Sequence, residues 1–462
     1  MHASAPATPP AGGHAASSSR RLLVIYAALV LAAIVLGFLG RRTDAGIEVA
    51  LGGLSFPLAF VLFALVLVGV AFFHHRTLLV ALSGAAVVTA YTVLLCPGFE
   101  WSVHQPRPGL LGHALHEGEH TLLNLGGLLL GFALLAKTFE DSGAPERLPR
   151  LLPKRPFASS MTLLGIVWIL SSFLDNIAAA MIGGVIARTA FKGRVTVAYL
   201  AAIVAASNAG GAWSVLGDTT TTMMWIDGVD ALDVVKAIVG SAAALAVLGI
   251  FGSYRQNRIQ PIAFDATGAK HPIDGVRLGI VALILAGAVT TNLLLDKPFV
   301  GVWAAILLGA LVRKPAWGEL PGAAKGAAFL LSLVWCASLM PVKALPGASW
   351  QTAGALGFVS AVFDNIPLTK LALDQGGYDW GVLAYAVGVG GSMVWFGSSA
   401  GVAISKDFPE ARDTVRWLRE GWFVIVAYVV GLAALLLVMG WHPHAAHRKA
   451  ADPGAPLAAP HR

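Results

Sequence analysis

The sequence contains few charged residues for its length. Of 462 residues, 32 are Lys or Arg and 25 are Asp or Glu, so 12% are charged, about half of the roughly 25% that is usual in soluble proteins. Hydrophobic residues make up 56% of the chain, and its mean hydropathy is +0.73. A water-exposed surface of this size cannot be built from that composition, which excludes a soluble enzyme and a disordered scaffold. A polytopic membrane protein remains.

Cysteines and basic runs are also scarce. Cys96 and Cys336 lie far apart in apolar stretches, so they fit neither a disulfide framework nor a cysteine-rich metal site. The formal net charge is +7, but no run of Lys and Arg exceeds two residues. We attribute the basic balance to loops that orient a membrane protein. We therefore expect the lipid bilayer as a partner, and neither nucleic acid nor a cofactor.

Long apolar runs dominate the rest of the chain and predict an all-α fold. We expect roughly 10 to 13 transmembrane helices, because each run is long enough to cross all or part of a bilayer. The two ends are rich in Ala and Pro, and we expect a disordered arm at 1–19 and a disordered tail at 441–462. The predicted runs lie near 22–40, 54–73, 77–96, 121–137, 158–187, 195–212, 232–252, 276–295, 299–312, 326–345, 351–373, 379–404 and 421–440.

Two motifs occur twice in the same order. Phe173-Leu-Asp-Asn-Ile177 is followed by a glycine-rich run, and Phe363-Asp-Asn-Ile366 is followed by a similar one. We infer a duplication, with N-terminal helices at 20–112, a first repeat at 113–260 and a second at 261–440. In each repeat a glycine pair, five intervening residues and then a single glycine predict a helix break: Gly210, Gly211 and Gly217, and Gly390, Gly391 and Gly397.

The polar residues of these motifs stand inside apolar runs. An ionisable side chain such as Asp175 or Asp364 is costly at membrane depth and usually functional. Broken helices are tolerated there only where they line an enclosed cavity, and paired breaks indicate a transporter binding site. The alternative is that Asp-Asn caps a helix and that the glycines allow close packing.

The candidate ligands are hard oxygen donors, which suit a small cation. Helix N-termini at the same breaks suit an anion instead, and the three carboxylates favour the cation. The candidate binding residues are Asp175, Asn176, Ser207, Asn208, Asp218, Thr219, Thr220, Asp364, Asn365, Ser392 and Ser398.

Three stretches resemble a known family. Residues 206–220, 364–367 and 388–402 are similar to the NhaD-type bacterial sodium/proton antiporters, whose superfamily also contains citrate, dicarboxylate and arsenite carriers. The resemblance extends from about His113 to Ala403. It implies two inverted repeats with broken helices or re-entrant hairpins, a homodimer, and a multi-pass location in the cell or inner membrane. It also implies that most of the candidate ligands form an ion site for Na⁺.

The function that we expect is secondary active exchange of Na⁺, or another small cation, for protons. In this hypothesis carboxylates alternately bind the proton and the cation, and no metal is needed beyond transported Na⁺. One alternative is a Na⁺- or H⁺-coupled citrate or dicarboxylate symporter.

A different alternative is an intramembrane zinc protease, because His116-Glu-Gly-Glu-His120 fits the H-E-x-x-H motif. Gly118 weakens the helix that this motif requires. We interpret Glu117 and His120 instead as a proton-entry or pH-sensing cluster, since histidine titrates near neutral pH. A solvated helix start is the other interpretation.

Lys370 departs from the resemblance, which implies an apolar residue there. The lysine can stand in for a bound cation or pair with a carboxylate. Asp364 is six residues away and therefore lies on a different helix face. Asp374, four residues further on, is the partner that helix geometry favours.

Overall fold

The computed structural model describes residues 12–43, 46–51, 54–73, 76–99, 109–262 and 272–444. The predicted arm and tail therefore lie largely outside the described residues. Residues 12–19, which we expected in the arm, form the start of the first helix, which spans Gly12–Leu39. The chain divides into two compact units, 1–100 with 339–344, and 101–338 with 345–462.

In its described residues the first unit contains three α-helices, a small sheet and the 3₁₀ segment η4 (Val342–Ala344). Helix α1 (Gly12–Leu39) packs against α2 (Leu58–Phe72), and α2 packs against α3 (Thr77–Leu95). Strands β1 (Arg41–Thr43), β2 (Gly46–Leu51) and β3 (Leu54–Pro57) form an antiparallel sheet in that order. The sequence did not predict this sheet. Ile47 and Val49 are buried in it, as suits β-branched residues on a pleated surface.

The second unit consists of helices. Its N-terminal part is α4 (Leu110–Glu117), the π-turn η1 (Gly118–Leu122), α5 (Leu123–Glu140) and the 3₁₀ segment η2 (Pro145–Leu151). The helices that follow are α6 (Pro156–Ser171), α7 (Asn176–Ala190), α8 (Val197–Gly211), α9 (Thr219–Ile226), α10 (Ala231–Val235) and α11 (Ile238–Ile259). The remaining segments are α12 (Gly275–Leu295), α13 (Pro298–Ala310), η3 (Trp317–Glu319), α14 (Leu320–Ser338), α15 (Trp350–Ser360), α16 (Asn365–Gln375), α17 (Trp380–Gly390), α18 (Ser399–Asp407), η5 (Pro409–Arg412), α19 (Thr414–Glu420) and α20 (Phe423–Met439).

Several helices have the length and composition of membrane spans. Among the described residues five qualify: Thr77–Leu95, Leu123–Glu140, Ala231–Ile259, Gly275–Leu295 and Trp317–Ser338. The pair α19 and α20, bent by 57°, adds a sixth if it is counted as one span. Other apolar helices are shorter, and breaks interrupt the predicted runs near 158–187, 351–373 and 379–404. The fold is that of an all-α polytopic membrane protein, as predicted.

The two repeats have matching element orders. In the first, α6 and α7 are followed by α8 and α9, and in the second α15 and α16 are followed by α17 and α18. Helix α6 packs on α8, and α15 packs on α17. The other helices of each repeat pack on helices of the opposite repeat: α7 packs on α18, and α16 packs on α9. The repeats are therefore interlocked through their broken helices.

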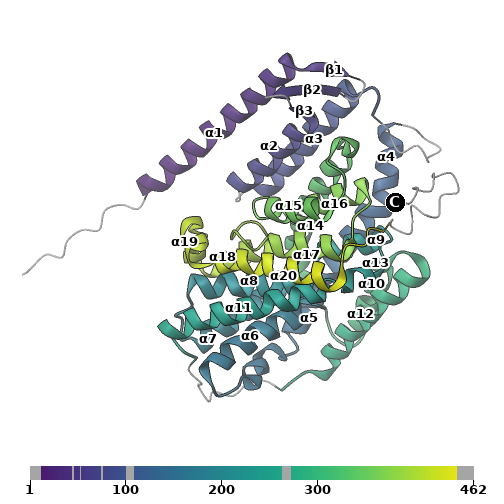
Figure 1. Cartoon of the computed structure of the whole chain (residues 1–462). Coiled ribbons are helices and arrows are strands. Elements are labelled where there is room, and N and C mark those ends of the chain that lie inside the picture. The colour runs from purple at the N-terminus through teal and green to yellow at the C-terminus, as the bar shows by residue number, and fades with distance from the viewer. Residues whose placement is uncertain are drawn as a thin grey trace, which may run out of the picture. The chain divides into compact units, whose positions relative to one another are not determined.

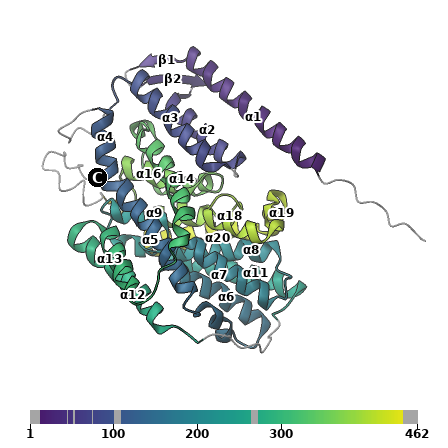
Figure 2. The ribbon, with the colours of Figure 1, turned by 180° about the vertical axis from the view of Figure 1, so that it is seen from behind.

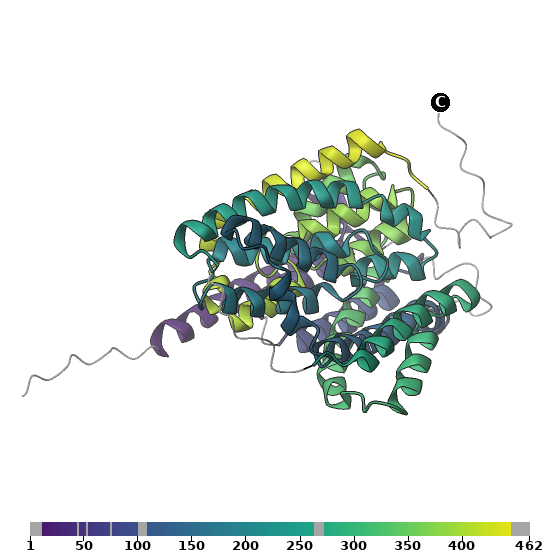
Figure 3. The same cartoon turned by 90° about the horizontal axis from the view of Figure 1, so that it is seen from below.

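The centre of the second unit is formed by α8 and α17. Every residue of both helices is buried, as expected for helices that are apolar on all sides. Helix α11 packs against α8 and α20 (Figure 1). Helix α13 lies against α5 (Figure 2) and forms a hairpin with α12, seen in teal and green in Figure 3.

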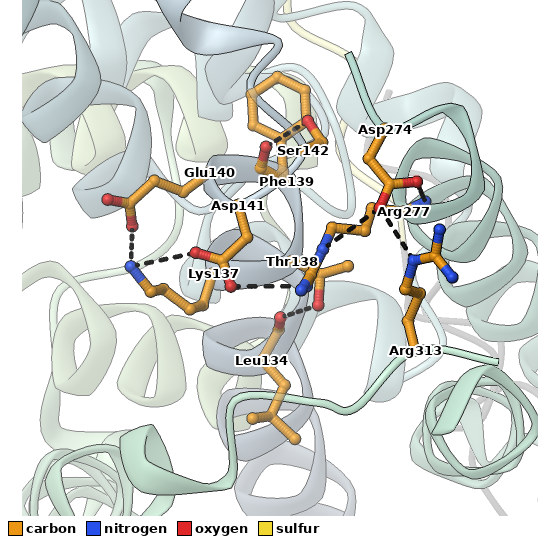
Figure 4. Close-up of polar contacts among 10 residues, drawn as sticks. All are labelled: Leu134, Lys137, Thr138, Phe139, Glu140, Asp141, Ser142, Asp274, Arg277 and Arg313. Carbon is orange, nitrogen blue, oxygen red and sulfur yellow. Dashed lines mark hydrogen bonds and ion pairs between the residues drawn. The ribbon is translucent and has the colours of Figure 1, made fainter. Parts of the chain in front are cut away.

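An ion-pair network joins the ends of α5, α12 and α13 (Figure 4). Asp274 caps α12 by accepting hydrogen bonds from the amides of Val276 and Arg277, at 3.0 and 3.2 Å. Its other oxygen lies 2.9 Å from Nε of Arg313, which follows α13. Arg277 also pairs with Asp141 at the end of α5 (3.5 Å). The hydrogen bond from Arg313 lowers the pKa of Asp274 below its usual range.

We predict that Asp274→Ala lowers the thermal unfolding midpoint of the detergent-purified protein at pH 7, because it removes both the helix cap and the pair with Arg313. A carboxylate with a lowered pKa stabilises the fold above its ordinary pKa, and this stabilisation is lost as the pH falls through the lowered value. The difference in unfolding midpoint between Asp274→Ala and the wild type should therefore become smaller only below about pH 4. Glu146→Ala, at an exposed acid of η2, is the control. Equal midpoints for the two variants at pH 7 contradict the prediction.

Candidate functional site

Three amide and hydroxyl side chains connect the broken helices at the centre. Asn176, the first residue of α7, donates from Nδ2 to Oδ1 of Asn208 on α8 (3.1 Å). Asn208 in turn donates from its Nδ2 to Oγ of Ser392, just beyond α17 (2.9 Å). All three side chains are buried. The structure thus brings together polar residues from both repeats that the sequence had suggested separately.

A second link crosses between the repeats at Asp218. Asn365, the first residue of α16, donates from Nδ2 to Oδ2 of Asp218 (3.3 Å). The other carboxylate oxygen of Asp218 accepts from the amide of Thr220 at 3.4 Å and caps α9. One buried aspartate therefore faces the start of a helix from each repeat.

Two further predicted residues cap the helices that follow the breaks. Asp364 accepts from the amide of Ile366 at the start of α16 (3.0 Å), and Ser398 accepts from the amide of Gly401 at the start of α18 (3.3 Å). Capping satisfies helix amides that have no intrahelical partner. The structure thus confirms that Asp364 and Ser398 cap helices, and a binding role for them stays a prediction.

A cavity of about 180 Å³ lies beside the first pair of breaks. Asp175, at the N-cap position of α7, lines it together with Asp218 and Thr219. The rest of its wall is apolar and comes mainly from α5 and α14. Two carboxylates that face one largely apolar cavity repel each other when both are ionised, so a shared proton or cation stabilises the pair.

The remaining predicted ligands differ in their contacts, since the buried Oγ1 of Thr220 has no hydrogen-bond partner among the described residues. Ser207 donates from its hydroxyl to the carbonyl of Val204 in its own helix (2.8 Å). The last two threonines of the run that follows Asp218 close the break between α8 and α9. The hydroxyl of Thr221 donates to the carbonyls of Ser214 (2.7 Å) and Asp218 (2.9 Å), and that of Thr222 donates to the carbonyls of Val215 and Asp218.

Ser360 was missed as a site residue. Its hydroxyl donates to the carbonyl of Val387 near the end of α17 (2.8 Å), and it satisfies a backbone group beside the break. A lone serine in an apolar run gives no local sequence signal of this contact. Only the packing of α15 on α17 reveals it.

Lys370 is buried between two carboxylates. Its Nζ lies 3.0 Å from Oδ1 of Asp374, which confirms the predicted pairing along one helix. It also lies 3.1 Å from Oε1 of Glu117 at the end of α4, a partner that the sequence did not suggest. Glu117 is thus held in a buried ion pair and does not stand at a solvated helix start.

The H-E-x-x-H stretch does not form one regular helix. Helix α4 ends at Glu117, and residues Gly118–Leu122 form a π-turn. The side chain of His120 lies outside the described residues. Among the side chains that the structure does describe, no cluster of three or more His, Cys, Asp and Glu is placed to hold a metal ion.

The predicted glycine breaks coincide with close backbone contacts. A Cβ added at Gly210 would overlap the carbonyl of Trp168, and one at Gly390 would overlap the carbonyl of Gly357. Gly217 and Gly397 face the carbonyls of Ser171 and Ala361 in the same way. A Cβ at Gly211 or Gly391 would lie 2.7 or 2.9 Å from the carbonyl oxygen of the single glycine that follows it. The glycines thus permit the same backbone approach in both repeats.

We predict that Gly210→Ala and Gly390→Ala each lower the free energy of unfolding by about 1–3 kcal/mol, because a methyl group must displace backbone. Gly165→Ala on α6 is the matched control, since nothing lies within 4 Å of its added Cβ. That change should stabilise the protein by roughly 0.5–1 kcal/mol, as alanine is the better helix former. SDS-induced unfolding in mixed micelles measures the free energy of unfolding of all three variants. If Gly210→Ala and Gly165→Ala change it by similar amounts, the close backbone contact at the break is contradicted.

The fold and the polar helix breaks define a multi-pass, all-α membrane protein whose polar groups converge at its centre. No protein-family profile matches the chain. It is 29% identical over 332 residues to sodium/proton antiporter 1 of Arabidopsis thaliana, which covers 61% of this chain and 56% of that protein. The chain thus spans little more than half the length of that relative.

Two bacterial relatives are covered more fully. The chain is 26% identical over 382 residues to the Na⁺/H⁺ antiporter NhaD of Alkalimonas amylolytica, covering 69% of this chain and 78% of that protein. It is 25% identical over 411 residues to the NhaD antiporter of Vibrio cholerae, covering 75% and 86%. The chain is therefore related to Na⁺/H⁺ antiporters, including those of the NhaD type, which confirms the resemblance seen in its motifs.

Proposed function

We propose that this protein exchanges Na⁺, or another small cation, for protons across a membrane. The observation that carries the proposal is the buried contact network in which Asn176, Asn208 and Ser392 join both repeats and Asn365 reaches Asp218. The names of the relatives, which are Na⁺/H⁺ antiporters, support the same conclusion. We further propose that the protein functions as a homodimer in the cell or inner membrane.

The proposed cation site uses the groups that meet at the helix breaks. Asp175 and Asp218 face the cavity and supply the charge, with Asp364 at the corresponding break of the second repeat. Amide and hydroxyl oxygens complete a set of hard ligands, which suits a small, weakly polarisable cation. The set comprises Asp175, Asn176, Ser207, Asn208, Asp218, Thr219, Thr220, Asp364, Asn365, Ser392 and Ser398.

Exchange follows if proton and cation compete for the same carboxylates. With a bound cation, Asp175 and Asp218 are both ionised and their repulsion is compensated. Without one, a proton removes a charge and relieves the repulsion. Movement of the interlocked repeats against the surrounding scaffold helices then alternates the side from which the site is reached. Release of a proton on one side is thereby linked to uptake of a cation from that side.

We predict that Asp175→Asn, Asp218→Asn and Asp364→Asn each reduce Na⁺-driven proton flux in proteoliposomes by at least about tenfold, since each removes a charge from a buried polar site. Flux is followed with a pH-sensitive dye while Na⁺, Li⁺, K⁺ and citrate are added in turn. Asp230→Asn, at an exposed N-cap of α10, is the matched control and should retain wild-type flux.

Two results contradict the proposal. One is wild-type flux in both Asp175→Asn and Asp364→Asn. The other is citrate uptake that depends on Na⁺ without cation/proton exchange, which indicates a carboxylate symporter in place of an antiporter.

A further inference from the structure

A buried lysine and two acids lie outside the proposed cation site. The side chain of Lys370 is 3% exposed, and that of Glu117 is 10% exposed. The ammonium lies 3.1 Å from Glu117 and 3.0 Å from Asp374. Asp227, which follows α9, and His113, one turn before Glu117, are nearby charged or titratable groups. The exchange chemistry described above uses none of these side chains.

The two partners of Lys370 differ in what they connect. Asp374 is on α16 itself, one turn further along, so this pair moves with the helix. Glu117 ends α4 and is separated from Lys370 by 253 positions in the chain. Of these two contacts of Lys370, the one with Glu117 joins α16 to another helix.

Helix α16 also carries part of the proposed site. Its first residue, Asn365, donates to Asp218, and Asp364 caps it. Lys370 lies about 7.5 Å further along the helix axis, at 1.5 Å per residue. The helix is thus attached at its start to the cap of α9 and in its middle to the end of α4. A shift of α16 at Lys370 is therefore transmitted directly to Asn365.

We propose that Lys370 is a positioning residue for the cation site. Its ion pair with Glu117 holds α16 in the position in which Nδ2 of Asn365 donates a hydrogen bond to Asp218. The inference rests on the proposed function for its transport readout. Breaking a buried pair normally leaves an uncompensated charge. Asp374 keeps the ammonium paired when Glu117 is replaced, so loss of that contact does not leave the lysine uncompensated.

The decisive comparison is Glu117→Gln against Asp374→Asn. Each removes one carboxylate partner of Lys370 and leaves the other in place, so the lysine keeps a counterion in both variants. In proteoliposomes Glu117→Gln should raise the KM for Na⁺ on the order of tenfold, with the maximal rate little changed. Asp374→Asn should change KM by less than about threefold. Lys370→Arg, which keeps the charge, should stay within about threefold of wild type.

A double variant separates positioning from a direct role of Glu117 in proton entry. If Glu117 acts through Lys370, Glu117→Gln combined with Lys370→Met should be no worse than the poorer single variant, because both remove the same contact. If the increases in KM caused by the two single substitutions multiply in the double variant, the inference is contradicted. Equal KM values for Glu117→Gln and Asp374→Asn also contradict it, because the lysine then needs only charge compensation.

Hydrogen exchange provides a readout that does not depend on transport. In the purified protein, Glu117→Gln should increase amide exchange in the first half of α16, from Asn365 to Lys370, while Asp374→Asn should not. Unchanged exchange in Glu117→Gln overturns the inference. If the wild-type protein shows no proton flux with any cation, only the proposed function is contradicted. The amide hydrogen-exchange result then still decides the role of Lys370.

Discussion

A helix that is interrupted inside a membrane leaves amide and carbonyl groups that lipid cannot satisfy, and this constraint governs the centre of the molecule. Asp218, Asp364 and Ser398 cap the helices after the breaks. Hydroxyls such as those of Thr221 and Ser360 satisfy the carbonyls before them. The side chains that satisfy the breaks also concentrate oxygen ligands in one place. The side chains that cap the helices after the breaks are therefore the same ones that we propose as cation ligands.

The duplicated backbone carries unequal chemistry in its two copies. Asp218 and Ser398 each follow the single glycine of a break and each cap the next helix, but only the first is charged. Ala212 stands at the position in the first repeat where the second has Ser392. Negative charge therefore concentrates at the break between α8 and α9, and Asn365 crosses from the second repeat to reach it. An asymmetric site between related halves is the expected result.

The sequence predicted the features that depend on local pattern. Composition indicated the all-α membrane fold, and the repeated glycine pairs indicated a helix break in each repeat. The spacing of Lys370 and Asp374 identified their pair. The contacts between Asn208 and Ser392 and between Glu117 and Lys370 join residues 184 and 253 positions apart. Such contacts depend on which helices pack together, and helical periodicity reports only which face of a helix is apolar.

The central claim is that Na⁺ and protons compete for the carboxylates at the helix breaks. Calorimetric titration of the purified protein with Na⁺, in two buffers of different ionisation enthalpy at one pH, tests it most directly. The account predicts that the binding heat differs between the buffers because Na⁺ displaces protons, and that this difference is lost in Asp175→Asn. Na⁺ binding with the same heat in both buffers would contradict the account.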